Sequence, residues 1–161
     1  MNKLLILLIA FVSTLVFALP EDTSQPIEIE AQLVVVDETT GFNEFSGNVI
    51  VRQGSLLLSA EVIQVQTNNE EVVRMVAKGS LEKPAKYTQN QENQTRFVEA
   101  TATQITYEVN EGMIFLVGNA HLVQGFDSFS GDTLNYDVNN DKVIVKGSKD
   151  GSQRVKFKIV L

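Results

Sequence analysis

A strand-like stretch that occurs twice is the feature that most constrains the fold. Residues 45–54 read Phe-Ser-Gly-Asn-Val-Ile-Val-Arg-Gln-Gly, and residues 116–125 read Leu-Val-Gly-Asn-Ala-His-Leu-Val-Gln-Gly. Gly-Asn and Gln-Gly recur at the same spacing, and apolar residues occupy alternate positions in both copies. Because side chains two apart point to the same side of a strand, each copy predicts a strand with one buried face. The Gln-Gly that follows predicts a turn.

A finer repeat places a glycine about eleven residues after an apolar or tyrosine residue, with a polar turn between them. Three pairs show this spacing: Val36 and Gly47, Tyr107 and Gly118, Tyr136 and Gly147. A looser and longer copy of the pattern runs from Ile63 to Gly79. Four hairpin units in series predict a repetitive antiparallel β protein in which no unit buries its apolar face alone. Since each periodic apolar segment beyond the N-terminal region follows period two and not 3.6, we expect an all-β fold.

The same alternation predicts where the individual strands lie. We expect strands at 26–31, 33–36, 45–54, 56–65, 72–77 and 82–88, a loose polar loop at 89–95, and further strands between 97 and 159. Pro84 has no amide hydrogen, which indicates the first residue of a strand or a strand at a sheet edge.

The first eighteen residues have the pattern of a secretory signal peptide. Lys3 is followed by a mostly apolar run over 4–17, and Val16-Phe17-Ala18 resembles a cleavage site. The run is short for a bilayer span, so we expect residues 1–18 to be removed and 19–161 to form one domain. An uncleaved membrane anchor is the alternative. The chain contains no cysteine, so we expect neither a disulfide nor a lipid-modified cysteine.

The charge of the chain is acidic and unevenly distributed. Without Lys3 the chain has twelve basic and twenty acidic side chains, a net charge of −8, which argues against a nucleic-acid partner. Residues 19–45 contain seven acidic and no basic side chains, whereas residues 142–161 contain six basic and one acidic. These two ends are either ordinary solvated surface or complementary surfaces that attract one another between copies.

Residues for catalysis or metal binding are scarce, so we expect no enzyme, metal or cofactor site. His121 is the only histidine, and strand alternation places it on the solvated face. Glu61 and Asp132 occupy equivalent positions of the repeat, which indicates a structural role. The apolar sheet face then has three possible uses: a packed sandwich core, a slot for acyl chains, or a support for strand edges that pair with another chain.

An ordered series of short motifs makes the chain similar to the OstA-like family over nearly all of 25–161. The motifs are Gln25-Pro26-Ile27-Glu28-Ile29-Glu30, Phe45-Ser46-Gly47-Asn48-Val49, Gln53-Gly54, Ala60-Glu61, Lys83-Pro84-Ala85, Tyr107 and Val117-Gly118-Asn119-Ala120. The resemblance implies a twisted β-jellyroll, open along one side, in the periplasm. It implies that an apolar groove carries the lipid A acyl chains of lipopolysaccharide without chemical change. It also implies head-to-tail homo-oligomers that bridge an LptC-like inner-membrane protein to an LptD-like outer-membrane protein.

Strand parity within the repeat selects the residues expected to line this groove. The candidate lipid-binding residues are Ile27, Ile29, Val34, Val36, Phe45, Val49, Val51, Leu56, Leu58, Met75, Tyr87, Ile105, Tyr107, Leu116, Leu122, Phe129, Leu134 and Tyr136. The resemblance implies lipid or partner contact at Ile27 and Tyr87, and it places Ile27 and Ile29 near the end that docks the preceding protein. Two other functions stay open: a structural module that polymerises without lipid, and an anchored partner similar to LptC.

Overall fold

The computed structural model describes residues 24–91 and 96–160, and all of the elements in those ranges are β-strands. They are β1 (Glu28–Glu30), β2 (Leu33–Asp37), β3 (Phe42–Gln53), β4 (Leu56–Asn68), β5 (Glu71–Lys78), β6 (Ala85–Gln91), β7 (Arg96–Ala102), β8 (Gln104–Glu108), β9 (Met113–Gln124), β10 (Asp127–Asp137), β11 (Lys142–Lys146) and β12 (Lys156–Lys158). The expected all-β fold is confirmed. The expected signal peptide, 1–18, lies outside the described residues.

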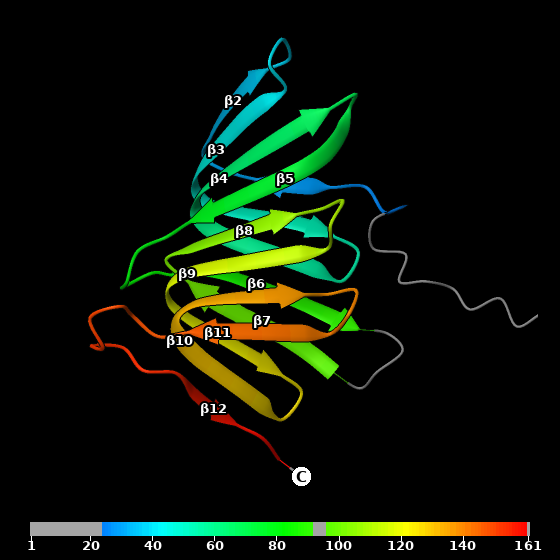
Figure 1. Ribbon diagram of the computed structural model, residues 1–161. Helices are drawn as coiled ribbons and strands as arrows, with labels where there is room; N and C mark the ends of the chain where they lie inside the picture. The colour runs from blue at the N-terminus through cyan, green and yellow to red at the C-terminus, as the bar shows by residue number, and fades with distance from the viewer. Residues whose placement is uncertain (1–23, 92–95, 161) are drawn as a thin grey trace, which may run out of the picture.

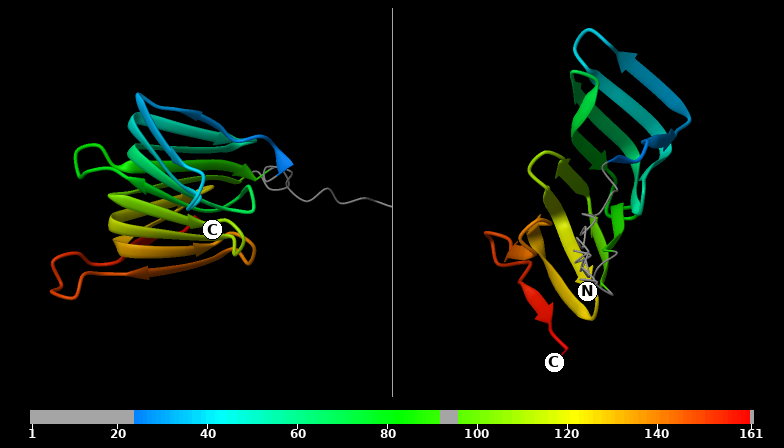
Figure 2. Two further views of the ribbon diagram at one scale, coloured as in Figure 1. Left: turned by 90° about the horizontal axis from the view of Figure 1, so that it is seen from above. Right: turned by 90° about the vertical axis from the view of Figure 1, so that its right-hand side faces the viewer.

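The four hairpin units that the sequence predicts are present. They are the antiparallel pairs β2–β3, β4–β5, β8–β9 and β10–β11. Pairing of β3 with β4, of β5 with β8 and of β9 with β10 joins the hairpins into one continuous sheet. Figure 1 shows the strands following one another from β2 at one end to β12 at the other. The first and last strands therefore lie at opposite ends of the stack, as the two views of Figure 2 also show.

Four long strands, β3, β4, β9 and β10, each pass through two layers of sheet. The first layer contains β2, β5, β8, β11 and residues 42–46, 62–68, 113–117 and 133–137 of the long strands. The second layer contains β1, β6, β7, β12 and residues 49–53, 56–60, 120–124 and 127–131. The twelve strands thus form a folded jellyroll whose two layers face each other.

The repeated Gly-Asn pair marks the corner where β3 and β9 cross between layers. Gly47 and Asn48 have φ angles of 85° and 49°, and Gly118 with its neighbouring asparagine repeats this with 79° and 51°. In both places the register of the hydrogen-bonded pair shifts, so that the two residues Gly-Asn of β3 or β9 lie opposite a single residue of the neighbouring strand, β4 or β10. Such a bulge bends a strand and increases its twist. The residues left opposite the bulges are Glu61 and Asp132, so the expected equivalence of these two positions in the repeat is confirmed.

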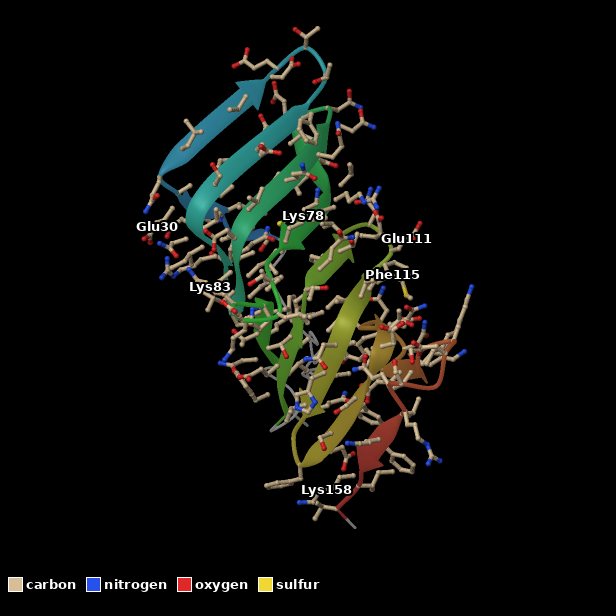
Figure 3. The ribbon with its side chains drawn as sticks, turned by 90° about the vertical axis from the view of Figure 1, so that its left-hand side faces the viewer. Glu30, Lys78, Lys83, Glu111, Phe115 and Lys158 are labelled. Atoms are coloured by element: carbon tan, nitrogen blue, oxygen red, sulfur yellow. The ribbon has the colours of Figure 1, made fainter. Side chains whose placement is uncertain are left out.

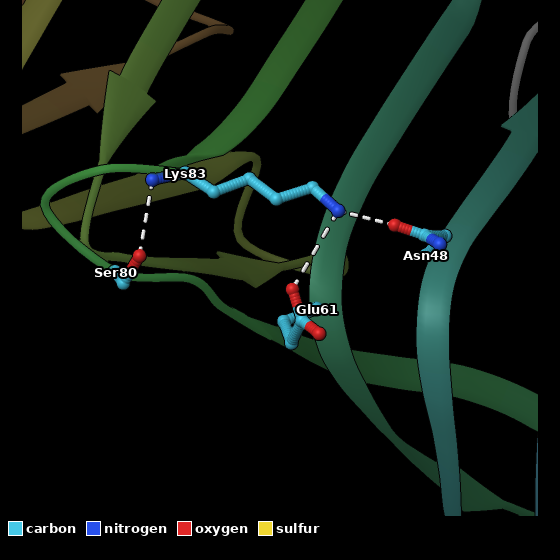
Figure 4. A network of polar contacts seen from close by, with 4 residues as sticks. All are labelled: Asn48, Glu61, Ser80 and Lys83. Carbon is cyan, nitrogen blue, oxygen red and sulfur yellow. Dashed lines mark hydrogen bonds and ion pairs between the residues drawn. The ribbon is translucent and has the colours of Figure 1, made fainter.

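The loop between β5 and β6 covers the outside of the first corner (Figure 4). The Lys83 ammonium lies 3.6 Å from a carboxylate oxygen of Glu61 and also donates to the Asn48 side-chain oxygen. The backbone N–H of Lys83 donates to the Ser80 hydroxyl at 3.0 Å. Because the ion pair is exposed, it contributes about 0–1 kcal/mol. Its main effect is to fix the loop against the bulge.

The core lies between the two layers. One inward row crosses the second layer through residues that pair directly with one another: Ile29, Val51, Leu58, Tyr87, Ala100, Leu122 and Phe129. Phe157 of β12 continues the row at the end of the stack, where it is 65% exposed. Tyr87 meets Tyr107 of the first layer edge to face, with ring centroids 6.2 Å apart. Small buried residues, including Ala60, Ala102 and Ala120, gather near the corners, where the layers converge.

Several strand boundaries differ from the sequence prediction, and two of these differences have a clear physical reason. Residues 89–91 were expected in a loose loop, but β6 continues to Gln91 because β7 pairs with it along its whole length. Backbone pairing here outweighs the low strand propensity of Gln and Asn. The strand expected at 82–88 begins only at Ala85, directly after Pro84, since proline cannot donate to the ladder.

Candidate functional site

Most of the predicted groove residues are brought together in one apolar core. Twelve of the eighteen are buried: Val49, Val51, Leu56, Leu58, Met75, Tyr87, Ile105, Tyr107, Leu116, Leu122, Leu134 and Tyr136. They come from both layers, so strand parity within the repeat identifies the inward faces of the two sheets.

The remaining six residues lie toward the ends of the stack. Ile27, Ile29, Phe45 and Phe129 are half-buried and pack against the core. Val34 and Val36 are 50% and 58% exposed. Both valines share the inward side with their β3 partners, but β1 is only three residues long and leaves them uncovered. Their place in a lipid groove stays a prediction, and in this structure the two side chains lie outside the buried core.

The interior between the layers is filled by the protein's own side chains. Leu58, Leu122 and Tyr87, from the middle of the second layer, are each no more than 1% exposed. The packed-core alternative therefore describes this central region. An acyl chain that entered here would have to displace side chains or move the layers apart.

The layers meet solvent along a seam on the side away from the Gly-Asn corners, which we call the mouth. The second layer contributes Gln53, Gln89 and Gln124 to the mouth, and the first layer contributes the turns at 68–71, 109–112 and 138–141. A pocket of about 350 Å³ opens at its N-terminal end, lined by Gln25, Ile27, Gln53, Glu70, Glu71, Val72, Val109 and Asn110. Sequence reasoning assigned Gln53 and Gln124 only to turns and missed that both side chains point inward.

The turns of the hairpins are fixed by carboxylates at equivalent positions. Asp37 accepts hydrogen bonds from the Thr40 and Thr39 backbone N–H groups at 3.1 and 2.9 Å, and those from Thr40 dominate in holding the pKa of Asp37 below its ordinary value. The Asn140 side chain, 2.7 Å away, and then its backbone N–H lower the pKa of Asp137 in the same way. These carboxylates therefore stabilise turns.

No group of three or more potential metal-ligating side chains occurs within residues 24–91 and 96–160. His121 is half-buried on the outer face of β9, where its Nδ1 lies 2.8 Å from the Ser130 hydroxyl. Its inward neighbours Ala120 and Leu122 are buried, so the predicted outward orientation is confirmed. Within the same ranges, no helix is long and apolar enough to span a bilayer.

The two ends of the stack differ in charge, as the sequence predicts. Glu30 of β1, which pairs with Arg52 at 2.5 Å, belongs to the acidic end, and Lys158 of β12 belongs to the basic end (Figure 3). At the acidic end, β2 exposes its apolar side chains, with Leu33, Val34, Val35 and Val36 all at least half exposed. Short edge strands at both ends have backbone groups available for pairing with another chain.

Comparison with known proteins gives consistent results. Residues 28–155 match the family model for "LptA/(LptD N-terminal domain) LPS transport protein". The lipopolysaccharide export system protein LptA of Escherichia coli strain K12 is 36% identical over 127 residues, which cover 79% of this chain and 68% of that protein. LptH of Pseudomonas aeruginosa strain PAO1, a protein of the same export system, is 29% identical over 141 residues, 88% of this chain and 79% of LptH.

A solved structure has the same fold. The crystal structure of LptH, described as the LptA-homologous periplasmic component of the lipopolysaccharide transport device from Pseudomonas aeruginosa, superimposes with a TM-score of 0.78. The match covers 88% of this chain and all of the LptH chain, at 25% identity. The matched region of the family model begins at the first residue of β1 and ends just before β12, so it includes both layers of the sheet.

Proposed function

The chain belongs to the family of LptA and LptD N-terminal-domain LPS transport proteins, and on this premise we propose that it is a periplasmic lipopolysaccharide carrier. In this role it bridges the inner and outer membranes and holds lipid A acyl chains between its two sheet layers. The observation that carries the proposal is the extent of the family match, which spans the strands of both layers. The relatives are transport proteins, and we propose that this chain likewise does no chemistry on its cargo.

The interior supports this proposal through its chemistry. Side chains that line it are almost all aliphatic or aromatic, and they come from strands of both layers. Each methylene that moves from water into such surroundings contributes about 0.8 kcal/mol. The pocket at the mouth, with Ile27, Val72 and Val109 in its walls, offers an acyl chain a first contact that requires no displacement of the central core.

The ends of the stack support the proposed partners. An acidic first edge and a basic last edge favour head-to-tail contacts between copies, with an LptC-like protein and an LptD-like protein at the two ends of the chain of subunits. Exposed apolar side chains on β2 add an area that a partner strand would cover. We place the domain in the periplasm, where its relative LptH is described.

Site-specific photo-crosslinking in cells tests lipid carriage. A photoreactive amino acid at Leu122 or Phe129, which point inward, should capture lipopolysaccharide, because an acyl chain in the interior would lie against them. The same amino acid at His121, the outward neighbour of Leu122, is the matched control and should capture none. Equal labelling at the three positions, or labelling at none, would contradict carriage in the interior.

Two other functions give different results. A structural module that only polymerises would form salt-sensitive filaments, because exposed charges are screened over roughly 10 Å at 0.1 M salt, but would carry no lipid. An anchored partner similar to LptC would retain residues 1–18, whereas a carrier would lose them. The mass of the protein purified from the whole cell envelope, with any bound lipid, distinguishes all three.

A further inference from the structure

The mouth contains a row of glutamines that a simple apolar core does not need. Gln53 and Gln124 end β3 and β9 at equivalent positions of the repeat, and each is only 7% exposed. Val98 pairs with both Gln89 and Gln124, so these two amides lie in one row across β6, β7 and β9. The rows deeper in the second layer are apolar. Amide side chains are thus concentrated at the level where the interior meets solvent.

Each amide in this row bonds to a group at the mouth. The Gln124 side-chain nitrogen lies 3.4 Å from the Tyr136 hydroxyl, and it also donates to a carboxylate oxygen of Asp141, in the turn that closes the first layer. The Tyr87 hydroxyl donates to the Gln89 side-chain oxygen at 2.5 Å. At the C-terminal end, the glutamine row therefore connects the two layers directly.

At the N-terminal end, the row borders open space instead. The Gln53 side-chain nitrogen donates to the Gln25 carbonyl at 3.1 Å, and both residues line the 350 Å³ pocket. The pocket has apolar walls from Ile27, Val72 and Val109 and polar walls from its other residues. A ligand in this pocket would therefore place hydrocarbon toward the core while its polar atoms remain beside Gln53.

We propose that Gln53, Gln89 and Gln124 form a hydrogen-bonding row that holds the ester and amide groups by which acyl chains join a sugar headgroup. This inference rests on the proposed carrier function, and it specifies the part of the lipid that the mouth recognises. When the chains fill the interior, their linkage carbonyls reach the level of the mouth. A carbonyl there loses water, and a glutamine NH₂ group can replace it as donor.

The chemistry of glutamine favours this class of group over others. A neutral amide donates and accepts hydrogen bonds, which suits carbonyls and hydroxyls, whereas phosphates are preferentially bound by Arg or Lys. The residues of the pocket include two glutamates and no basic side chain, so it disfavours anionic groups. The mouth thus matches the uncharged linkage region of an acylated sugar and not its phosphates.

Two matched amphiphiles test the inference. Sucrose monolaurate and dodecyl maltoside both join a twelve-carbon chain to a disaccharide, but only the first has an ester carbonyl. Below their micelle concentrations, the intact protein should bind the ester more tightly. The double variant Gln53→Leu/Gln124→Leu should bind the ester roughly tenfold more weakly, the effect of one lost hydrogen bond, and the ether with unchanged affinity. Binding is measured by calorimetry.

Three controls make the result decisive. Gln104→Leu, on the outer face of β8, should bind both amphiphiles as the natural protein does. Gln89→Leu alone should reproduce part of the ester-specific loss, which keeps the test valid should the double variant fail to fold. Equal weakening for ester and ether, or no weakening for either, would overturn the glutamine inference and leave carriage standing. If the natural protein binds neither these probes nor purified lipid A, the carrier function fails, and the inference fails with it.

Discussion

The bulged corner should be intolerant of a single added methyl group at Gly118. Gly118 has a φ of +79°, and a Cβ there would lie 2.1 Å from the Thr103 hydroxyl oxygen. That hydroxyl donates to the Val117 carbonyl at 2.8 Å. A left-handed conformation costs a non-glycine residue about 1–2 kcal/mol. Displacing the hydroxyl removes a hydrogen bond worth about 1 kcal/mol, so Gly118→Ala should lower the free energy of unfolding by about 2–3 kcal/mol.

A second glycine separates the two contributions. Gly151 also has a positive φ, of +76°, but a Cβ there would meet nothing within 4 Å. Gly151→Ala should therefore show the backbone strain alone, about 1–2 kcal/mol. Thr103→Ala should lower the free energy of unfolding by about 1 kcal/mol, because it removes the same hydrogen bond. In the double variant, Thr103→Ala should add almost nothing to the effect of Gly118→Ala, because Gly118→Ala alone already breaks that bond. In this double-mutant cycle, the effect of the double variant on the free energy of unfolding should be about 1 kcal/mol smaller than the sum of the two single effects.

Urea unfolding followed by tyrosine fluorescence measures these differences. The chain has no tryptophan, and its three tyrosines, Tyr87, Tyr107 and Tyr136, all lie in the core, so their signal reports the packing of the two layers. A decrease of about 2–3 kcal/mol is a large part of the 5–15 kcal/mol typical of a domain. Additive effects in the cycle, or a Gly118→Ala variant within 0.5 kcal/mol of the natural protein, would refute this account of the corner.

Further predictions concern the core and one acidic turn. Leu58→Ala should lower the free energy of unfolding by about 2–5 kcal/mol because the side chain is buried, whereas Val36→Ala, 58% exposed, should change it by no more than about 0.5 kcal/mol, both by urea unfolding. Hydrogen bonds, first from the Ser148 hydroxyl and then from Ser152, lower the pKa of Asp150 to about 2, so an NMR titration should find its midpoint there. Because the pKa of Asp150 is lower in the folded than in the unfolded protein, its carboxylate stabilises the fold at pH values above the unfolded pKa of 3.8. This contribution should disappear as the pH falls toward 2. The Asp150→Asn variant should lack this pH dependence.

The hairpins and the inward faces could be predicted from sequence because both follow from local rules. Alternation fixes which side of a strand is buried, and the recurring Gly-Asn fixes where a strand bends. Parity from Val49 and Val51 also places residue 53 inward, so the same rule could have identified Gln53. The Gln-Gly pair is a turn signal through its glycine, and that signal does not indicate where the neighbouring glutamine side chain points.

The pairing of the two layers could not be predicted in the same way. β6 pairs with the start of β4 and β7 with the end of β9, contacts between residues far apart in sequence that no local pattern encodes. The exposure of Val34 and Val36 has the same origin, since it depends on how far β1 extends above them. For the same reason, a filled interior and an open slot give identical alternation in sequence.

The filled interior has a consequence for the proposed transport. An acyl chain that enters exchanges contacts among side chains for contacts with the lipid, so its net gain is smaller than the roughly 0.8 kcal/mol per methylene for transfer from water. A carrier that passes lipid onward needs a small net binding energy, because the full transfer energy of several acyl chains would prevent their release. The bulged corners, where small residues let the layers approach, resist separation, whereas the mouth is connected by a few polar contacts such as that between Gln124 and Asp141. Opening should therefore begin at the mouth, where each broken contact can be replaced by one to the lipid.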